Sequence, residues 1–274
     1  MVLWLAQLKL NPQKCHSFTI TLKQAPIRHT YFINTTLLRH VAEVRDLGII
    51  LDSKLTFSAH VSSVVTKANR SLGLLIRSFQ TGFPKQKFDK KALLTAYCAN
   101  IRSILEFGSV IWSGAAKTHL NRLERVQHKF LMWLACRTRG TDRSVNLEYP
   151  RLLMAFNITT LEARREQLDL MFLRNVFIGK VDSTFLVGCF GMHVPRRPTR
   201  QAVLFHVPFA RVSSVKTGLF SRLCTVANSF LGFSPQVDFL SGDFKTFRSC
   251  LLAYIRRPKW RARPDDLATC LFLF

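Results

Sequence analysis

The stretch SAHVSSVVTKANRSLGLLIRSF, residues 58–79, marks the point where the chain changes from an alternating to a helical pattern. Its apolar side chains recur every three, four or seven positions, which is the spacing of a helix with one buried face. The charges off this stripe are Lys67, Arg70 and Arg77, all of them basic. The stretch therefore predicts a long amphipathic helix whose apolar stripe is Val61, Val65, Ala68, Leu72, Leu75 and Phe79.

Toward the C-terminus the helical pattern continues. An Asp at a helix start and a Gly at its end are ordinary cap signals, and Ser/Thr-x-x-Glu is a capping box. Residues 180–235 contain four prolines and read as irregular, and the tail Arg256–Arg263 is basic and broken by proline. The predicted helices run from Asp89 to Gly108 (stripe Leu93, Tyr97, Ile101 and Leu105), over His119–Arg137 (stripe Leu123, Val126, Phe130 and Leu134), from Thr159-x-x-Glu162 to near Gly179, and over Asp243–Ile255 (Phe244, Phe247, Leu251 and Tyr254 inward).

Toward the N-terminus the pattern is that of β-structure. Ser17–Leu22 alternates apolar and polar residues, as a half-buried strand does. Tyr31–Leu38 has the form of a hairpin around Asn34-Thr35, because Asn tolerates a positive φ. Val44–Asp52 reads as another apolar strand, in which Gly48 indicates a bulge or a close backbone approach. The sequence as a whole predicts an α+β fold that is mostly α.

Composition narrows the class of protein. Among 274 residues, 48% are hydrophobic, so the chain can bury one large core or two small ones. Lys and Arg total 40 against 16 Asp and Glu, a formal net charge of +24. A compact body this basic repels itself unless a polyanion covers it, and nucleic acid rewards each neutralised phosphate by releasing counterions. We therefore expect nucleic acid as the partner; the alternative is ordinary basic drift in an open reading frame.

Several other classes of protein lack their signals here. The seven cysteines form no CxxC pair, and the eight histidines have no metal-ligand spacing, so no metal site is expected. No P-loop, GxSxG, HExxH or GxGxxG occurs, which argues against a small-molecule cofactor. No apolar run reaches the ~20 residues that span a bilayer, and residues 1–10 carry no cleavage site. We expect an intracellular protein, in nucleus or cytoplasm, neither secreted nor membrane-bound.

Four motifs follow one another along the chain. They are Leu10-Asn11-Pro12-Gln13-Lys14-Cys15 before a strand; Val44-Arg45-Asp46-Leu47-Gly48-Ile49-Ile50-Leu51-Asp52-Ser53-Lys54-Leu55-Thr56-Phe57; Ala96-Tyr97 with Ile104-Leu105-Glu106-Phe107-Gly108-Ser109-Val110-Ile111-Trp112; and Leu120-Asn121-Arg122-Leu123-Glu124-Arg125-Val126-Gln127-His128-Lys129-Phe130. In this order they resemble the region downstream of the active site in non-LTR retrotransposon reverse transcriptases, jockey-like elements in particular. The resemblance continues at His193-Val194-Pro195, Thr199-Arg200-Gln201 and Ala227-Asn228.

The resemblance implies three regions. Residues 1–57 would be a truncated palm remnant with a primer-grip-like hairpin, residues 58–140 a helical thumb-like region, and residues 141–274 a helical and irregular C-terminal region with a basic tail. Within the palm remnant, Lys14 would lie near the incoming nucleotide, where a cation offsets charge on the leaving pyrophosphate. Leu47 and Gly48 would form the primer grip. A loop lysine and a buried strand are the purely structural alternatives for these positions.

A thumb holds a primer–template duplex through its phosphates, which positions the duplex without reading its sequence. The candidate residues for this contact with an RNA/DNA hybrid or duplex are Lys54, Lys67, Arg70, Arg77, Arg122, Arg125 and Lys129. For any one of them a solvated helix face is the ordinary alternative. Because all seven are positively charged, the set as a whole favours binding to phosphate.

The polymerase chemistry of the family needs carboxylates that hold two Mg²⁺ ions. By the resemblance these aspartates precede the segment that matches Asn11–Cys15, so we expect them to lie before Met1 and expect this chain to hold no cofactor. Asp265-Asp266 follows Pro264, which cannot donate in a hairpin ladder, and we reject it as the catalytic pair. The sequence thus predicts a fragment of an RNA-directed DNA polymerase that is inactive alone. The alternatives are a domesticated nucleic-acid-binding protein and a non-functional transposon remnant.

Overall fold

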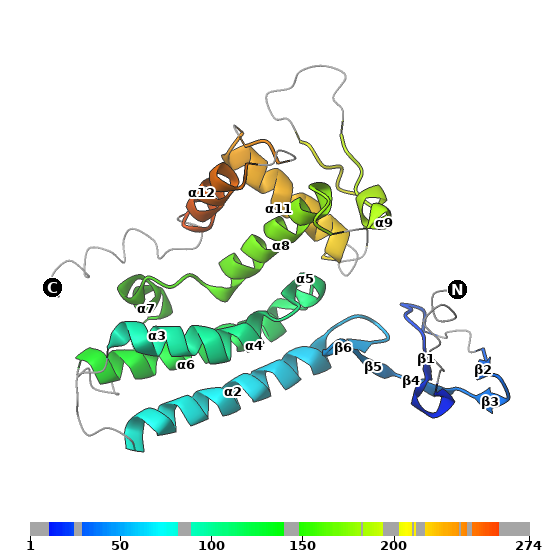
Figure 1. Ribbon diagram of the computed structural model, residues 1–274, viewed down its shortest axis with the longest axis horizontal. Coiled ribbons are helices and arrows are strands. Elements are labelled where there is room, and N and C mark those ends of the chain that lie inside the picture. The colour runs from blue at the N-terminus through cyan, green and yellow to red at the C-terminus, as the bar shows by residue number, and fades with distance from the viewer. Residues whose placement is uncertain are drawn as a thin grey trace. The chain divides into compact units, whose positions relative to one another are not determined.

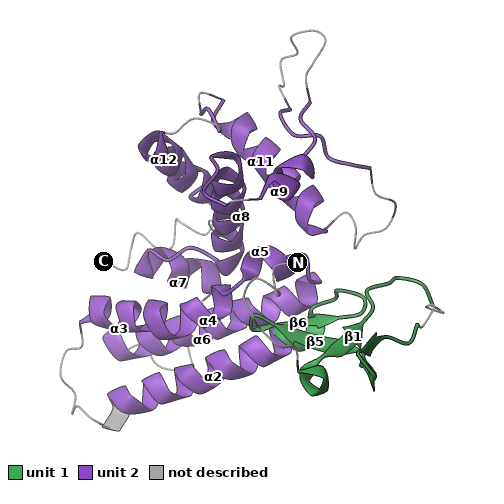
Figure 2. Cartoon of the chain, turned by 45° about the vertical axis from the view of Figure 1, so that its right-hand side comes forward, with its two compact units in different colours: residues 1–60 green, residues 61–274 purple. Residues whose placement is uncertain are grey.

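The computed structural model of the chain describes residues 11–24, 29–81, 89–139, 148–181, 183–193, 203–209, 211, 217–235, 237–239 and 243–257. The chain divides into two compact units, Met1–His60 and Val61–Phe274 (Figure 2). Strands occupy the first unit and helices the second. The expected α+β, mostly α fold is confirmed.

The described residues of the first unit form three pairs of short strands. One pair is parallel, His16–Phe18 (β1) with Arg39–Val41 (β4), and it follows a single 3-10 turn, Pro12–Lys14 (η1). The other two pairs are antiparallel hairpins (Figure 1). They are Phe32–Ile33 (β2) with Thr36–Leu37 (β3), and Glu43–Asp46 (β5) with Ile49–Asp52 (β6).

Local backbone preferences explain the two hairpins. Asn34 has a φ of 53°, so the hairpin predicted around Asn34-Thr35 is confirmed. Leu47 and Gly48 have φ angles of 43° and 91° and form the two-residue turn between β5 and β6. The strand predicted over Val44–Asp52 is therefore two strands, and Gly48 lies in a turn rather than in a bulge.

The strand predicted over Ser17–Leu22 is shorter than expected. β1 ends at Phe18, and Ile20 and Leu22 are more than half exposed. Beyond β1 the backbone N–H of Thr21 donates instead to the carbonyl of Ser53, at 2.9 Å. The alternation in this segment therefore does not correspond to a strand with one buried face.

The second unit is built from helices of very different length. Two long helices, α2 and α6, carry its first half, and α8, α11 and α12 carry its second half (Figure 1). The helices are Ser58–Thr81 (α2), Lys90–Tyr97 (α3), the π-helical turn Cys98–Arg102 (η2), Ser103–Glu106 (α4), Ser109–Trp112 (α5), Lys117–Arg139 (α6), Tyr149–Phe156 (α7), Leu161–Phe177 (α8), Thr184–Gly188 (α9), Leu219–Phe233 (α11) and Phe244–Ile255 (α12).

Helices α2 and α6 run parallel to each other. Arg122 Nη1 donates to Ser62 Oγ at 2.9 Å near the start of both helices, and Arg137 Nη2 donates to the carbonyl of Phe79 near their ends. The stripe predicted for α6, Leu123, Val126, Phe130 and Leu134, is fully buried. On α2 the buried face includes Val64, whereas Val65 and Leu75 are only half-buried.

The segment from α3 to α4 is one helix widened by a π turn. Asp89 caps its start, as predicted, by accepting the backbone N–H of Lys91. Tyr97 stacks on Phe130 of α6 with ring centroids 4.2 Å apart. The chain turns at Gly108, whose φ of 61° is left-handed. A π turn adds one residue to the helix and so rotates the residues after it to a different face.

The second half has its own core of aromatic side chains. Helices α8, α11 and α12 enclose Phe205, Phe230, Phe239, Phe247 and Tyr254, which meet mostly edge to face. The expectation that residues 180–235 are irregular is wrong for α11, a helix of 15 residues. The last helix begins one residue after its cap Asp243, and its first residue, Phe244, is half exposed rather than inward.

Candidate nucleic-acid interface

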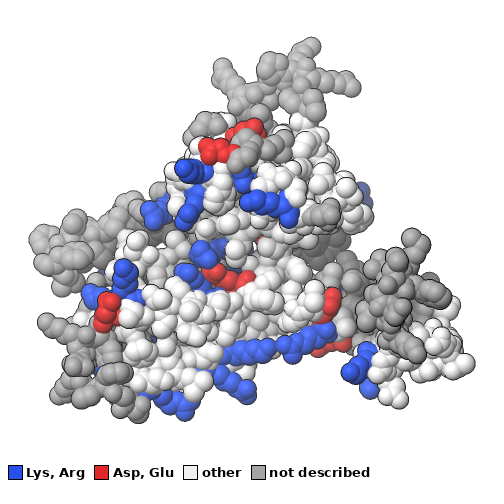
Figure 3. All heavy atoms as spheres, in the orientation of Figure 1, with Lys and Arg blue, Asp and Glu red and all other residues white. Residues whose placement is uncertain are grey.

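The exposed side of α2 is basic along its length. Lys67, Arg70 and Arg77 are exposed, and the helix contains neither Asp nor Glu. Arg77 Nε donates to the carbonyl of Gly73 at 3.3 Å, so its stem lies back along the helix. Blue side chains follow the lower edge of the view in Figure 3 over the middle and C-terminal part of α2, with no red ones beside them.

On α6 the three candidate cations have different surroundings. Arg125 and Lys129 lie one turn apart on the exposed side of the helix, and neither makes an ion pair within the part of the chain that the structure describes. Arg122 is half-buried and bonded to Ser62, so it joins α6 to α2. The exposed face of α6 thus offers Arg125 and Lys129 to an anion, while Arg122 serves the packing of the helices.

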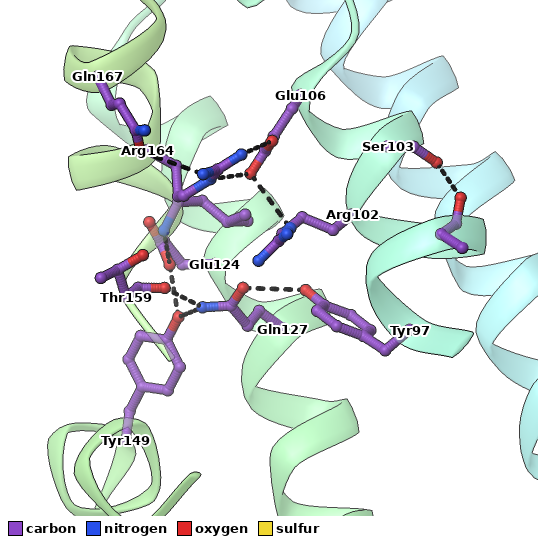
Figure 4. Close-up of polar contacts among 12 residues, drawn as sticks. Tyr97, Arg102, Ser103, Glu106, Glu124, Gln127, Tyr149, Thr159, Arg164 and Gln167 are labelled. Carbon is purple, nitrogen blue, oxygen red and sulfur yellow. Dashed lines mark hydrogen bonds and ion pairs between the residues drawn. The ribbon is translucent and has the colours of Figure 1, made fainter. Parts of the chain in front are cut away.

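The one acidic residue of α6 is turned away from that face. Glu124 Oε1 accepts the backbone N–H of Glu162 at 2.8 Å, and its Oε2 accepts that of Leu161 at 3.3 Å. The same Oε2 accepts the hydroxyl of Tyr149 at 2.6 Å (Figure 4). A carboxylate at a helix N-terminus satisfies amides that lack partners within the helix. Glu124 therefore caps α8 and leaves no free negative charge beside Arg125.

Gln127 completes this network one turn further along α6. Its Oε1 accepts the hydroxyl of Tyr97, and its Nε2 donates to the hydroxyl of Tyr149 and the carbonyl of Thr159. Gln127 is wholly buried, and every polar atom of its amide group has a partner (Figure 4). Burial raises the pKa of both tyrosines well above the ordinary value of 10. The hydroxyls therefore stay protonated, and the network fixes α3, α6, α7 and α8 together.

A second set of charges joins α4 to α8. Arg164 makes a two-point contact with Glu106, with Nε and Nη2 each 2.8 Å from a carboxylate oxygen. The hydrogen bonds that Arg164 donates to Glu106 raise the pKa of Arg164, and Arg102 adds a longer contact of 3.7 Å to the same carboxylate. Bidentate pairs of this kind are stronger than ordinary hydrogen bonds. Glu106 therefore serves to hold α4 against α8.

Asp169 joins α8 to α11 in a similar way. Its carboxylate accepts Nε of Arg222 at 2.9 Å and Nη2 at 3.3 Å. Burial raises the pKa of Asp169, and the Arg222 guanidinium opposes that rise. Asp169, Glu106 and Glu124 are alike in that each carboxylate is bound by other groups of the helical unit. Each of these three acids meets a helix end or an arginine, so none of them neutralises the exposed sides of α2 and α6.

In the strand unit, the turn between β5 and β6 is the most exposed candidate. Leu47 is 89% exposed although it is apolar, and its φ is positive, a backbone conformation that favours Asn or Gly. Gly48 beside it needs no Cβ at its φ of 91°. The tip therefore presents an apolar side chain in a conformation that costs the hairpin stability.

Lys54 is held by the turn that follows β6. The carboxylate of Asp52 accepts the backbone N–H groups of Lys54, Thr56 and Phe57 and the hydroxyl of Thr56. Although burial alone raises the pKa of Asp52, these bonds together lower it below 3.8. The side chain of Lys54 is exposed. Asp52 thus fixes the backbone of the turn that presents this lysine.

Lys14 ends η1, where Asn11 accepts the backbone N–H of Gln13 at 3.0 Å. Its side chain is exposed. Within the described ranges no three His, Cys, Asp or Glu side chains come close enough to hold a metal ion. Nor does any helix there have the length and apolarity needed to cross a membrane. Asp265-Asp266, Val194-Pro195 and Thr199–Gln201 lie outside the described residues.

Sequence reasoning did not single out the polar network around Gln127 or the capping role of Glu124. Both residues lie in the fourth motif, but no local pattern shows these roles, because their partners are 22 to 38 positions away. It also passed over Lys117, exposed in the first turn of α6, and Lys23, exposed beside Thr21. In the sequence only their positive charge marks them as candidates, and 40 residues of this chain carry that charge.

Comparison with known proteins gives relatives of one kind. The RNA-directed DNA polymerase from mobile element jockey of Drosophila melanogaster is 29% identical over 153 residues, which are 53% of this chain and 16% of that protein. The probable RNA-directed DNA polymerase from transposon BS of the same organism is 28% identical over 44% of this chain and 13% of its own length. That from transposon X-element is 25% identical over a similar share.

These similarities confirm the resemblance to part of a jockey-like non-LTR reverse transcriptase. The chain matches about one sixth or less of the length of each of these relatives. No protein-family model matches the chain, and no solved structure does.

Proposed function

We propose that this chain, similar to part of jockey-like RNA-directed DNA polymerases, is the part of such an enzyme that holds the primer–template. The observation that carries the proposal is the one-signed exposed surface of α2 and α6, where Lys67, Arg70, Arg125 and Lys129 make no ion pair with any acid that the structure describes. Long helices with such faces contact the phosphates of a duplex at regular intervals and do not read bases. An RNA/DNA hybrid or a duplex is the expected partner, inside the cell, in nucleus or cytoplasm.

The proposal includes the strand unit. An exposed Leu47 at a strained turn, with Gly48 beside it, is suited to contact with a nucleic-acid strand, as the resemblance to a primer grip implies. Strained backbone tends to occur at functional sites. Lys54 and Lys14 are exposed cations of the same unit. Lys14 would act near a nucleotide only in the presence of the catalytic carboxylates.

We further propose that the chain does not polymerise by itself and that it carries no cofactor of its own. Three acids in the described part of the chain support packing: Glu106 pairs with Arg164, Asp169 pairs with Arg222, and Glu124 caps α8. These residues do not fit the two Mg²⁺ ions that polymerisation needs, because two-metal catalysis requires carboxylates free to coordinate. A primer-extension assay with the purified chain, an RNA template and Mg²⁺ tests this directly. Extension would refute it.

The binding proposal is tested by fluorescence anisotropy with a labelled RNA/DNA hybrid at several KCl concentrations. Affinity should fall steeply with salt, and the log–log slope should drop by about two when two phosphate-contacting cations are neutralised. The variants are K67Q/R70Q on α2 and R125Q/K129Q on α6. A matched control, K245Q/R248Q, removes two exposed charges from α12. An equal loss of affinity in all three variants would mean that binding depends on net charge alone and not on a site at α2 and α6.

One observation favours the alternative of a non-functional remnant. In the strand unit Ile20, Leu22, Phe32 and Leu37 are all more than half exposed. Exposed apolar residues and open edges of short strand pairs promote aggregation. Thermal unfolding followed by circular dichroism separates the two: a cooperative transition with hybrid-dependent stabilisation supports the binding protein, and a broad transition without it supports the remnant.

A further inference from the structure

The strand unit contains a polar hollow of about 270 Å³. The residues that line it include three with hydroxyl groups, Thr19, Thr21 and Ser53, and two lysines, Lys23 and Lys54. The rest of its described lining is His40, Gln24 and Ala42. Among the described residues that line it there is no Asp or Glu. The three hydroxyl residues are half-buried, while the two lysines and the histidine are exposed.

Hydrogen bonds fix the backbone around this hollow. The N–H of Thr21 donates to the carbonyl of Ser53 at 2.9 Å, which joins its two sides. The N–H of Lys23 donates to Thr21 Oγ1 at 3.1 Å, and that of Lys54 donates to the Asp52 carboxylate at 3.1 Å. Both lysines therefore start from short bonded turns, although their side chains are free to reach inward.

The charge of the hollow is not compensated nearby. Within the described part of the chain neither Lys23 nor Lys54 lies within ion-pairing distance of an acid. Asp52 is the acid closest to Lys54 in sequence, and both of its oxygens already accept bonds within their turn. Two ammonium groups and three hydroxyls can all donate to one tetrahedral oxyanion, and the ammonium groups make charge-assisted bonds.

We propose that this hollow binds a phosphate group. The shared chemistry is that of a phosphate oxyanion, which belongs either to the backbone of a nucleic acid or to a free or terminal phosphate. The site goes beyond the function proposed for α2 and α6, because it lies in the other unit and uses different residues. It adds Lys23, the hydroxyl residues and His40 to Lys54, which the sequence marked as a candidate for contact with a duplex.

Lysine acetylation by a water-soluble ester, read by mass spectrometry on the full chain, tests the site without any mutation. The probes are inorganic phosphate, a thymidine oligomer with hydroxyl groups at both ends, and KCl at matched ionic strength. Phosphate occupancy should slow acetylation of Lys23 and Lys54 about threefold or more beyond the KCl sample. The internal controls are Lys90 and Lys91, which are exposed on α3.

Each outcome of this experiment has a meaning. Protection by the oligomer, which carries only diesters, assigns the hollow to a nucleic-acid backbone. Protection by inorganic phosphate alone assigns it to a free or terminal phosphate. Protection of Lys23 and Lys54 no greater than that of Lys90 and Lys91 overturns the proposal.

Two variants sharpen the result. Thr19→Val and Ser53→Ala remove hydroxyls without changing charge, and the double variant should lose most of the protection while its circular dichroism spectrum stays that of the parent. Retained protection would contradict a built phosphate site. R125Q/K129Q should leave the protection unchanged, so this site and the proposed α2 and α6 interface can fail separately.

Discussion

Glu124 Oε1 lies 2.8 Å from the backbone nitrogen of Glu162, so a side chain from α6 caps the N-terminus of α8. Helix caps usually come from the residue before the helix, and Thr160 also fills that place by accepting the N–H of Ala163. The second cap from another helix means that α6 and α8 stabilise each other electrostatically.

Glu124→Gln should therefore lower the free energy of unfolding by about 2 kcal/mol, since it removes charge-assisted bonds to two amides and to Tyr149. Urea denaturation followed by circular dichroism measures the loss. Glu162→Gln is the matched control, because it removes an exposed charge from the same helix end. A loss as large in the control would mean that the effect is one of net charge.

The single variant Arg164→Met should lose more free energy of unfolding than the double variant Glu106→Gln/Arg164→Met. The single change leaves the mostly buried Glu106 carboxylate without its bidentate partner, at a cost of about 3 kcal/mol. The double variant removes both charges of this pair, and Arg102, which loses its longer contact to Glu106, is partly exposed to solvent. A double-mutant cycle in urea gives the coupling energy of the pair. Additive losses would mean that the contact contributes little.

Variants of Arg122 and Arg125 should have different effects, the first on stability and the second on nucleic-acid binding. Arg122→Gln breaks the bond to Ser62 and should lower stability by about 1 kcal/mol, with little change in the salt slope of hybrid binding. Arg125→Gln should leave stability unchanged and reduce that slope by about one. Melting curves and anisotropy on the two purified variants make the comparison. The reverse pattern would place Arg122 in the interface.

Leu47→Asn should stabilise the β5–β6 hairpin by about 1 kcal/mol, because Asn adopts a positive φ at lower cost and Asn-Gly is a favoured two-residue turn. Hydrogen exchange of the amides in residues 43–52 should slow about fivefold. Hybrid binding should weaken at the same time if the leucine contacts the primer. Faster exchange would show that the Leu47 side chain supports the fold.

Asp52 should make the strand unit sensitive to acid. Its pKa in the folded state is below the unfolded value of 3.8, so the folded state binds fewer protons. Its contribution is thus complete above that value and is lost as the pH falls through the lowered pKa. Pepsin digestion between about pH 5 and about pH 2 should cut residues 43–57 increasingly fast. Asp52→Asn should be cut readily across this range.

Periodicity was sufficient for the long helices because their buried faces repeat. It predicted α6 to within two residues at each end and the full stripe from Leu123 to Leu134. It did not find α11, where buried Ser221 and the prolines before the helix obscure the pattern. The sequence predicts Thr159 as the cap of α8, but the cap is Thr160, whose hydroxyl accepts the N–H of Ala163.

The candidate interface was predictable in sign but not in geometry. The sequence marks Arg122, Arg125 and Lys129 alike, and only the position of Ser62 on a neighbouring helix distinguishes the first from the other two. The hairpin at Leu47-Gly48 was implied by the family resemblance and missed by the apolar pattern, because an exposed leucine reads as a strand residue.

The network of Tyr97, Glu124, Gln127 and Tyr149 has a consequence for splitting the chain. A break within residues 140–147 would separate α6 from α7 and α8, and each piece would expose polar groups that only the other can satisfy. The two fragments should then recognise each other when mixed, as halves of a reporter protein do. The two parts of the helical unit thus depend on each other as two subunits of a complex do, although one chain contains both.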